Sequence, residues 1–178
     1  GAEQILQSIR LLEEVERSIP NVGGSNLIGK LSIRSIISSA QFELDIRSSA
    51  SEEEKLAAAA RHESSLATLK TGGVFVGQSY RTLGDRLVKF ADIAGPENRR
   101  TALISASRMF AESASLFGQH QQERWGSIKI QEANAQAELG WADSSASGSE
   151  NLLRALELFK IGRTAKETGR PHWKWLAW

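Results

Sequence analysis

Apolar residues recur along this chain at intervals of three and four positions, the spacing that gathers side chains on one face of an α-helix. Ile5, Ile9 and Leu12 follow this spacing in the first segment, among charged and polar residues. No segment shows the sustained alternation of apolar and polar residues that predicts a β-strand. The pattern therefore predicts an all-α protein.

Glycine, proline and capping residues divide this pattern into segments of about 20 residues. Ser51 and the three glutamates after it form a capping-box sequence. Ser147 and Glu150 suggest a second capping box at the end of the small, polar linker 143–149. We expect helices over about 2–19, 26–47, 52–71, 74–94, 97–119, 123–142 and 148–167, with a partial eighth from Pro171.

The second of these segments is apolar on more than one side. Ile28, Ile33, Ile37 and Phe42 widen the apolar stripe that its other residues define. A helix that is apolar nearly all round is usually buried between its neighbours. We therefore expect the helix over 26–47 to be largely covered.

A longer period is superimposed on the helical one. The pattern Ala-x-x-x-Phe occurs as Ala106 with Phe110 and again as Ala155 with Phe159, each preceded by a leucine and followed by a tryptophan. A period of about 48 residues is typical of stacked helical repeats. We expect both alanines to lie at close contacts between helices.

Composition narrows the function without naming it. The 22 basic and 21 acidic residues give a net charge of +1, so no broad attraction to nucleic acid or to an anionic membrane is expected. The absence of cysteine excludes disulfides and cysteine nucleophiles and fits a reducing compartment, so we expect the cytoplasm. No apolar run approaches the 18 or so residues of a membrane span.

A family resemblance rests on two sets of residues. Tyr80, Leu83, Gly84 and Leu87 match the spacing of the first helix of a tetratricopeptide repeat. The two Ala-x-x-x-Phe pairs match its second helix, and Pro171 matches its closing proline. The chain thus resembles tetratricopeptide-repeat proteins, and over its last third it looks like a bacterial variant with longer repeats.

The resemblance has one clear departure. Lys129, Glu132 and Ala133 stand in the sixth segment where an aromatic residue, a leucine and a glycine would fall. Each segment is also about a turn longer than in the ordinary repeat of about 34 residues.

The resemblance implies one domain over 1–178, folded as a right-handed α-solenoid of antiparallel helix hairpins. Residues 97–178 would form the clearest repeats, and 2–48 and 51–95 less regular ones. It further implies a non-catalytic module that binds a peptide or partner protein on its concave face and needs no cofactor.

The first helix of each pair lines the concave face of such a solenoid, here the second, fourth and sixth segments. Gln131 and Asn134 fall where the family carries amides that hold a ligand's backbone, since an amide both donates and accepts hydrogen bonds. The candidate partner-binding residues are Arg34, Gln78, Arg81, Asp85, Gln131, Asn134 and Glu138.

All five tryptophans lie after residue 124. Three of them, Trp173, Trp175 and Trp178, fall in the last eight residues, where no further helix follows to cover them. Because tryptophan has a large apolar surface, we expect this segment either to fold back onto the seventh helix or to contact a second copy of the chain.

Other functions have weaker support. The chain could be a regulatory or sensor segment of a larger protein, a helical domain that binds a small ligand, or a helical enzyme in which Asp85 and Glu138 converge. The histidines lack metal-ligand spacing, and the glutamates of 52–54 fit a helix dipole better than a metal site. The glycines of 72–77 suit a phosphate only weakly, and Arg99 with Arg100 are the only basic pair of note.

Overall fold

The structure is a computed structural model that describes residues 1–20, 24–118 and 121–168. Within these ranges the chain forms seven α-helices, one short 3-10 helix and no strand, so the all-α prediction is confirmed. The expected eighth helix and the three C-terminal tryptophans lie outside the described residues. The helices are α1 (Ala2–Ser18), α2 (Gly24–Ser48), α3 (Glu52–Ala67), η1 (Lys70–Gly72), α4 (Val74–Ala91), α5 (Pro96–Phe117), α6 (Gln122–Trp141) and α7 (Ala146–Thr168).

Capping residues explain where several helices begin. The Ser51 hydroxyl accepts a hydrogen bond from the Glu54 amide at 3.2 Å, and the Glu54 carboxylate accepts one from the Ser51 amide at 3.3 Å. The first predicted capping box is therefore confirmed. The second is wrong, because α7 already begins at Ala146 and the Ser145 hydroxyl accepts the Ser147 amide at 3.2 Å.

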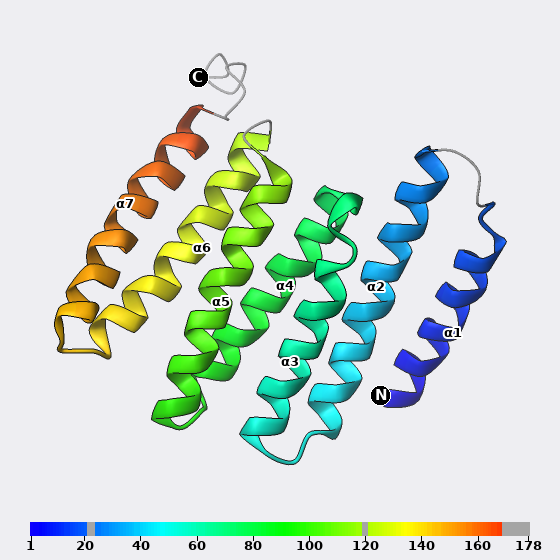
Figure 1. Ribbon diagram of the computed structural model, residues 1–178, viewed down its shortest axis with the longest axis horizontal. Coiled ribbons are helices and arrows are strands. Elements are labelled where there is room, and N and C mark those ends of the chain that lie inside the picture. Colours follow the sequence, from blue (N-terminus) through cyan, green and yellow to red (C-terminus); the bar gives the residue numbers. More distant parts are fainter. Residues whose placement is uncertain (21–23, 119–120, 169–178) are drawn as a thin grey trace, which may run out of the picture.

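The seven helices lie side by side, from α1 at one end of the molecule to α7 at the other (Figure 1). Each helix packs against the next in the chain, while α2 also contacts α4 and α3 also contacts α5. Helix α3 and the following η1 are tied to α5 by four polar contacts: Asn98 with Glu52 at 2.8 Å and with Glu53 at 3.2 Å, Glu63–Arg108 at 2.6 Å and Lys70–Glu112 at 2.7 Å.

Helices α4 and α5 share a large part of the buried core. Tyr80 and Leu83 of α4 and Leu103 and Phe110 of α5 are almost completely buried. Gly84 faces Phe110, and a Cβ atom at Gly84 would lie 2.7 Å from the Phe110 Cε1 atom. Only glycine at this position lets the ring pack against the α4 backbone, as its place in the sequence pattern suggested.

Helices α6 and α7 approach each other through two glycines. A Cβ atom at Gly162 would lie 2.7 Å from the Gly126 carbonyl oxygen, and one at Gly126 would lie 2.6 Å from the Gly162 carbonyl oxygen. The backbones are therefore in direct contact here. Ala106 and Ala155 are also buried, as expected of small residues between helices.

The first two helices are packed more loosely. On α1 only Ile9 is buried. Leu27, Ile28 and Ile36 of α2 are 57%, 48% and 50% exposed. The prediction that α2 is covered all round is therefore wrong, because its neighbours cover only part of its circumference.

Candidate functional site

One side chain links the predicted polar stripes of α4 and α6. The Arg81 Nε atom donates a hydrogen bond to the Gln131 Oε1 atom at 2.9 Å, and the Gln131 Nε2 atom donates one to the Asp85 Oδ1 atom at 2.6 Å. Three of the seven candidate residues thus meet in one cluster, although Gln131 lies 50 positions from Arg81 and 46 from Asp85 in the sequence. We call Arg81, Asp85 and Gln131 the α4–α6 cluster.

The α4–α6 cluster is half-buried, and this changes its electrostatics. Burial raises the pKa of the Asp85 carboxyl group above its ordinary value, while the nearby charges of Arg81 and Lys89 oppose the rise. Partial burial also strengthens hydrogen bonds to such groups, because less water competes for them. The three side chains therefore form a half-buried polar network that connects α4 to α6.

The other candidates surround this cluster or lie apart from it. Gln78 and Asn134 are exposed, one helical turn from Arg81 and from Gln131 respectively. The Glu138 carboxylate pairs with Arg99 of α5 at 2.8 Å. Arg34 pairs with Glu16 of α1 at 2.6 Å, on the part of α2 that faces α1, so it does not join the cluster.

A buried ion pair occupies the place where the sequence departs from the repeat pattern. The Glu132 side chain is 2% exposed, and the Lys129 Nζ atom donates to its Oε2 atom at 2.8 Å. The same Nζ atom lies 5.9 Å from the centroid of the Trp125 ring. The sequence analysis identified Lys129 and Glu132 as departures from the repeat pattern but did not predict their ion pair. Two opposite charges three positions apart on one helix could have indicated it.

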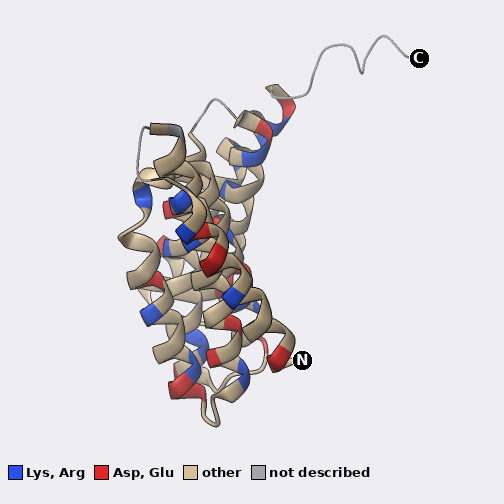
Figure 2. Cartoon of the chain, turned by 90° about the vertical axis from the view of Figure 1, so that its right-hand side faces the viewer, with Lys and Arg blue, Asp and Glu red and all other residues tan. Residues whose placement is uncertain are grey.

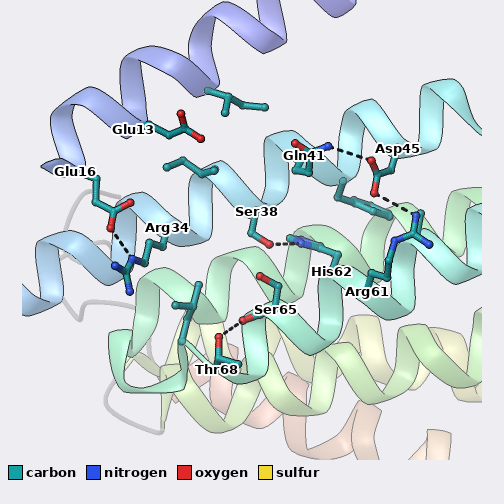
Figure 3. Close-up of a pocket in the computed structure, with 15 residues that line it drawn as sticks. Glu13, Glu16, Arg34, Ser38, Gln41, Asp45, Arg61, His62, Ser65 and Thr68 are labelled. Carbon is teal, nitrogen blue, oxygen red and sulfur yellow. Dashed lines mark hydrogen bonds and ion pairs between the residues drawn. The ribbon is translucent and has the colours of Figure 1, made fainter.

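A second candidate is a cleft of about 590 Å³ along α2, between α1 and α3 (Figure 3). Its walls carry charged and hydroxyl side chains. Asp45 accepts hydrogen bonds from Gln41 at 3.1 Å and from Arg61 at 3.3 Å. The Ser38 hydroxyl lies 2.7 Å from the Nδ1 atom of His62, and both residues line the cleft.

His62 is held rigidly in the neutral form. The residue is 5% exposed, and its ring stacks on Phe42 with the ring centroids 5.0 Å apart. Burial lowers the pKa of His62 to about 4, although the charge of Asp45 opposes this change. The arrangement agrees with the structural role that the sequence favoured for this histidine.

The contact between Ser38 and His62 has the geometry of a nucleophile beside a base, but two features weaken that interpretation. A base with a pKa of about 4 takes up a proton poorly at neutral pH. Among the described residues, no carboxylate is hydrogen-bonded to His62 to orient its ring. Asp85 and Glu138 likewise have separate partners rather than forming a catalytic pair.

Neither a metal site nor a basic patch at Arg99 and Arg100 is found over residues 1–20, 24–118 and 121–168. No group of three or more His, Asp or Glu side chains in these ranges has the arrangement of a metal site. Arg99 and Arg100 pair with Glu138 and Asp143 rather than forming a patch. Basic and acidic residues alternate over the face shown in Figure 2.

Two further results bear on the class of protein. None of the described helices combines the length and the apolar character that crossing a bilayer requires. A scan against protein-family models, a search of curated proteins and a search of solved structures each find no match.

Proposed function

We propose that this chain is a non-catalytic interaction module that binds a peptide or partner protein through the α4–α6 cluster and the exposed amides beside it. The module would be a right-handed solenoid of helix hairpins of tetratricopeptide type, acting in the cytoplasm. One observation carries the proposal: the Gln131 amide joins two polar stripes that are far apart in the sequence into one surface.

The arrangement suits recognition of an extended backbone. Gln78, Arg81 and Asp85 follow one line along α4, and Gln131, Asn134 and Glu138 follow a second along α6. The central residues are half-buried and held by one another, so little side-chain entropy is lost when a ligand binds them. The exposed Gln78 and Asn134 provide donors and acceptors for a peptide unit.

The packing around the surface supports the same use. The buried Gln136 amide donates to the Ser107 hydroxyl at 2.6 Å, and the buried Ser113 hydroxyl donates to the Gly77 carbonyl at 2.7 Å. These bonds connect α5 to α6 and to α4. A rigid support of this kind preserves the spacing of the two stripes, which binding of a defined partner requires.

The test is a selection of peptides from a random library displayed on phage, with the 178-residue chain as bait. The dissociation constants of the selected peptides are then measured for the chain and for a Gln78→Ala/Asn134→Ala variant. Since both amides are exposed, we expect the variant to melt at the same temperature and to bind at least about tenfold more weakly.

A matched control removes one glutamine and one asparagine elsewhere, as Gln7→Ala on α1 with Asn151→Ala on α7. This control should bind the selected peptides with unchanged affinity. Equal binding by the chain and by the Gln78→Ala/Asn134→Ala variant, for every selected peptide, would remove the binding site from this surface.

A further inference from the structure

A pocket of about 310 Å³ lies where the ends of α2 and α4 meet the start of α3. Phe42, Ala59 and Leu87 line it, and each is at most 6% exposed and belongs to the main core. The pocket therefore opens directly onto the apolar interior. Its other apolar lining residues are Ile46, Phe90 and the 76% exposed Ile93.

The charged residues around this pocket are strongly unbalanced. Four cations, Arg47, Lys55, Arg86 and Lys89, accompany a single acid, Glu43. The two arginines share that acid, since Arg47 lies 3.0 Å from its Oε1 atom and Arg86 lies 3.0 Å from its Oε2 atom. Neither lysine ammonium group makes an ion pair with a described residue. A net positive charge thus surrounds the pocket in a chain whose total charge is only +1.

The helix dipole explains only part of this excess. Arg47 and Lys89 lie in the last turns of α2 and α4, where a cation interacts favourably with the helix C-terminus. Lys55 lies near the N-terminus of α3, where the dipole disfavours a cation, and Arg86 lies within α4. Since Arg86 pairs with Glu43 at 3.0 Å, Lys55 is the one cation of the four that neither a helix dipole nor an ion pair with a described residue explains.

We propose that this pocket binds a peptide segment in which a bulky apolar side chain is flanked by Asp or Glu. The apolar side chain fills the space over Phe42, Ala59 and Leu87, and the acids pair with the lysines on the rim. None of the seven residues of the predicted stripes lines this pocket. The site is therefore additional to the proposed function, although its Lys89 lies one helical turn from Asp85 and its charge acts on that carboxyl group.

The size of the pocket and its combination of apolar and cationic residues favour such a peptide over a whole small molecule or a nucleic acid. A volume of about 310 Å³ is at the lower limit for a pocket that encloses a whole small molecule, but it accommodates a single anchoring side chain. A nucleic-acid backbone would neutralise the cations and leave the apolar lining in water. A peptide that combines one apolar anchor with acids satisfies both parts.

The experiment uses fluorescein-labelled heptapeptides, Ser-Glu-Asp-X-Asp-Glu-Ser, in which X is Phe, Leu or Ala. Binding to the 178-residue chain is followed by fluorescence anisotropy at 50 mM and 300 mM NaCl. We expect the Phe and Leu peptides to bind at least fivefold more tightly than the Ala peptide. The affinity should also fall severalfold at the higher salt concentration, because the rim charges are exposed and screened.

The site is located with the variant Lys55→Glu/Lys89→Glu, which should weaken binding of the Phe peptide at least tenfold. A second variant, Lys55→Gln/Lys89→Gln, removes the charges without reversing them and covers the case in which the first fails to fold. Arg10→Glu/Lys160→Glu makes the same charge change on α1 and α7 and should leave the affinity unaltered.

Three results would overturn the proposal. Equal affinity for the Phe and Ala peptides would mean that charge alone attracts them. Equal losses in the pocket variants and in the Arg10→Glu/Lys160→Glu control would mean that no site is involved. Saturable binding of sodium dodecanoate, with no binding of any peptide, would identify the pocket as a site for a small amphiphile. The proposed function is tested separately, by comparing how phage-selected peptides bind to the chain and to its Gln78→Ala/Asn134→Ala variant. A negative result with the heptapeptides therefore does not affect it.

Discussion

The two ends of this row of helices are built differently. From α4 to α7, glycines allow close contacts between helices. At Gly84 the α4 backbone contacts the Phe110 side chain of α5, and at Gly126 and Gly162 the backbones of α6 and α7 contact each other. At the α1 end, only Ile9 of the first helix is buried, and a cleft of about 590 Å³ runs between α1 and α3. The same helical pattern in the sequence thus produces two degrees of packing.

The difference shows that an amphipathic pattern does not determine how closely two helices pack. Both ends have apolar residues at helical spacing, but small residues decide how closely two helices approach. Where glycine faces a neighbouring helix, the interface closes and buries polar groups such as Glu132 along with it. In α1 and α2, the only glycine of the helix interior, Gly29, has no atom nearer its Cβ position than Ile19 Cδ1 at 3.9 Å.

The largest loss of stability is expected from breaking the ion pair between Lys129 and Glu132 of α6. Lys129→Met leaves the buried Glu132 carboxylate with only the exposed Arg154, whose guanidinium lies 3.9 Å away, and should lower the free energy of unfolding by about 3–4 kcal/mol. Urea denaturation at pH 7 measures it. Lys129→Met/Glu132→Leu should recover most of the loss, because both charges are then absent, and Lys160→Met on the surface of α7 should change little. A loss below about 1 kcal/mol for Lys129→Met would contradict the pair's burial.

The next prediction tests the glycine contact itself. Gly162→Leu must displace the Gly126 carbonyl and the Ile130 side chain, whose atoms would lie 2.7 Å and 2.8 Å from the new Cβ. We expect a loss of about 3 kcal/mol, at the upper end for overpacking. Gly29→Ala at the loose end is the control, and it should stabilise the chain slightly because it improves helix propensity. Similar losses for both variants would mean that the two ends are packed alike.

His62 gives the loose end a pH dependence. Its pKa is about 4 in the folded chain and 6.5 in the unfolded chain, so the unfolded state binds more protons between these values. The stability contribution is therefore complete above pH 6.5 and is lost as the pH falls toward 4, by up to about 3 kcal/mol. Urea denaturation from pH 7.5 to 4.5 should show a steeper loss for the chain than for His62→Gln. Parallel curves would show that His62 titrates normally.

The smallest effect concerns the α4–α6 cluster. Gln131→Ala removes two hydrogen bonds between α4 and α6 and should cost about 1–2 kcal/mol. Asn134→Ala, one turn away and exposed, should stay within about 0.5 kcal/mol of the parent chain. Thermal unfolding of the two variants side by side is sufficient. An unchanged melting temperature for Gln131→Ala would mean that the amide does not join the helices.

The helices themselves were largely predictable from the sequence. The capping box at Ser51 acts through a neighbour three positions away, and Gly84 acts through the one side chain, Phe110, that packs against it. The start of α7 was misplaced, because Ser145 and Ser147 are equally good capping residues by type. Only the backbone path decides which of them lies at the helix end.

The sites were harder to predict, since they join segments from several helices. The stripe residues were identified by spacing, but the contact of Gln131 with both Arg81 and Asp85 depends on how α6 is rotated against α4. The basic pocket was missed altogether, because Arg47, Lys55 and Lys89 are separate residues with no common motif. The opening beside α2 was missed because apolar periodicity indicates a face that packs, and does not indicate whether a neighbour covers it.

Native-state hydrogen exchange, read by mass spectrometry on peptic fragments, tests the central comparison most directly. We predict that amides in α4, α5 and α6 exchange only through global unfolding, whereas those of α1 and the first half of α2 exchange through local opening at a lower free energy. Gly162→Leu should reduce the protection of α6 and α7 first. Equal protection of α1 and α5, at the free energy of global unfolding, would contradict the account.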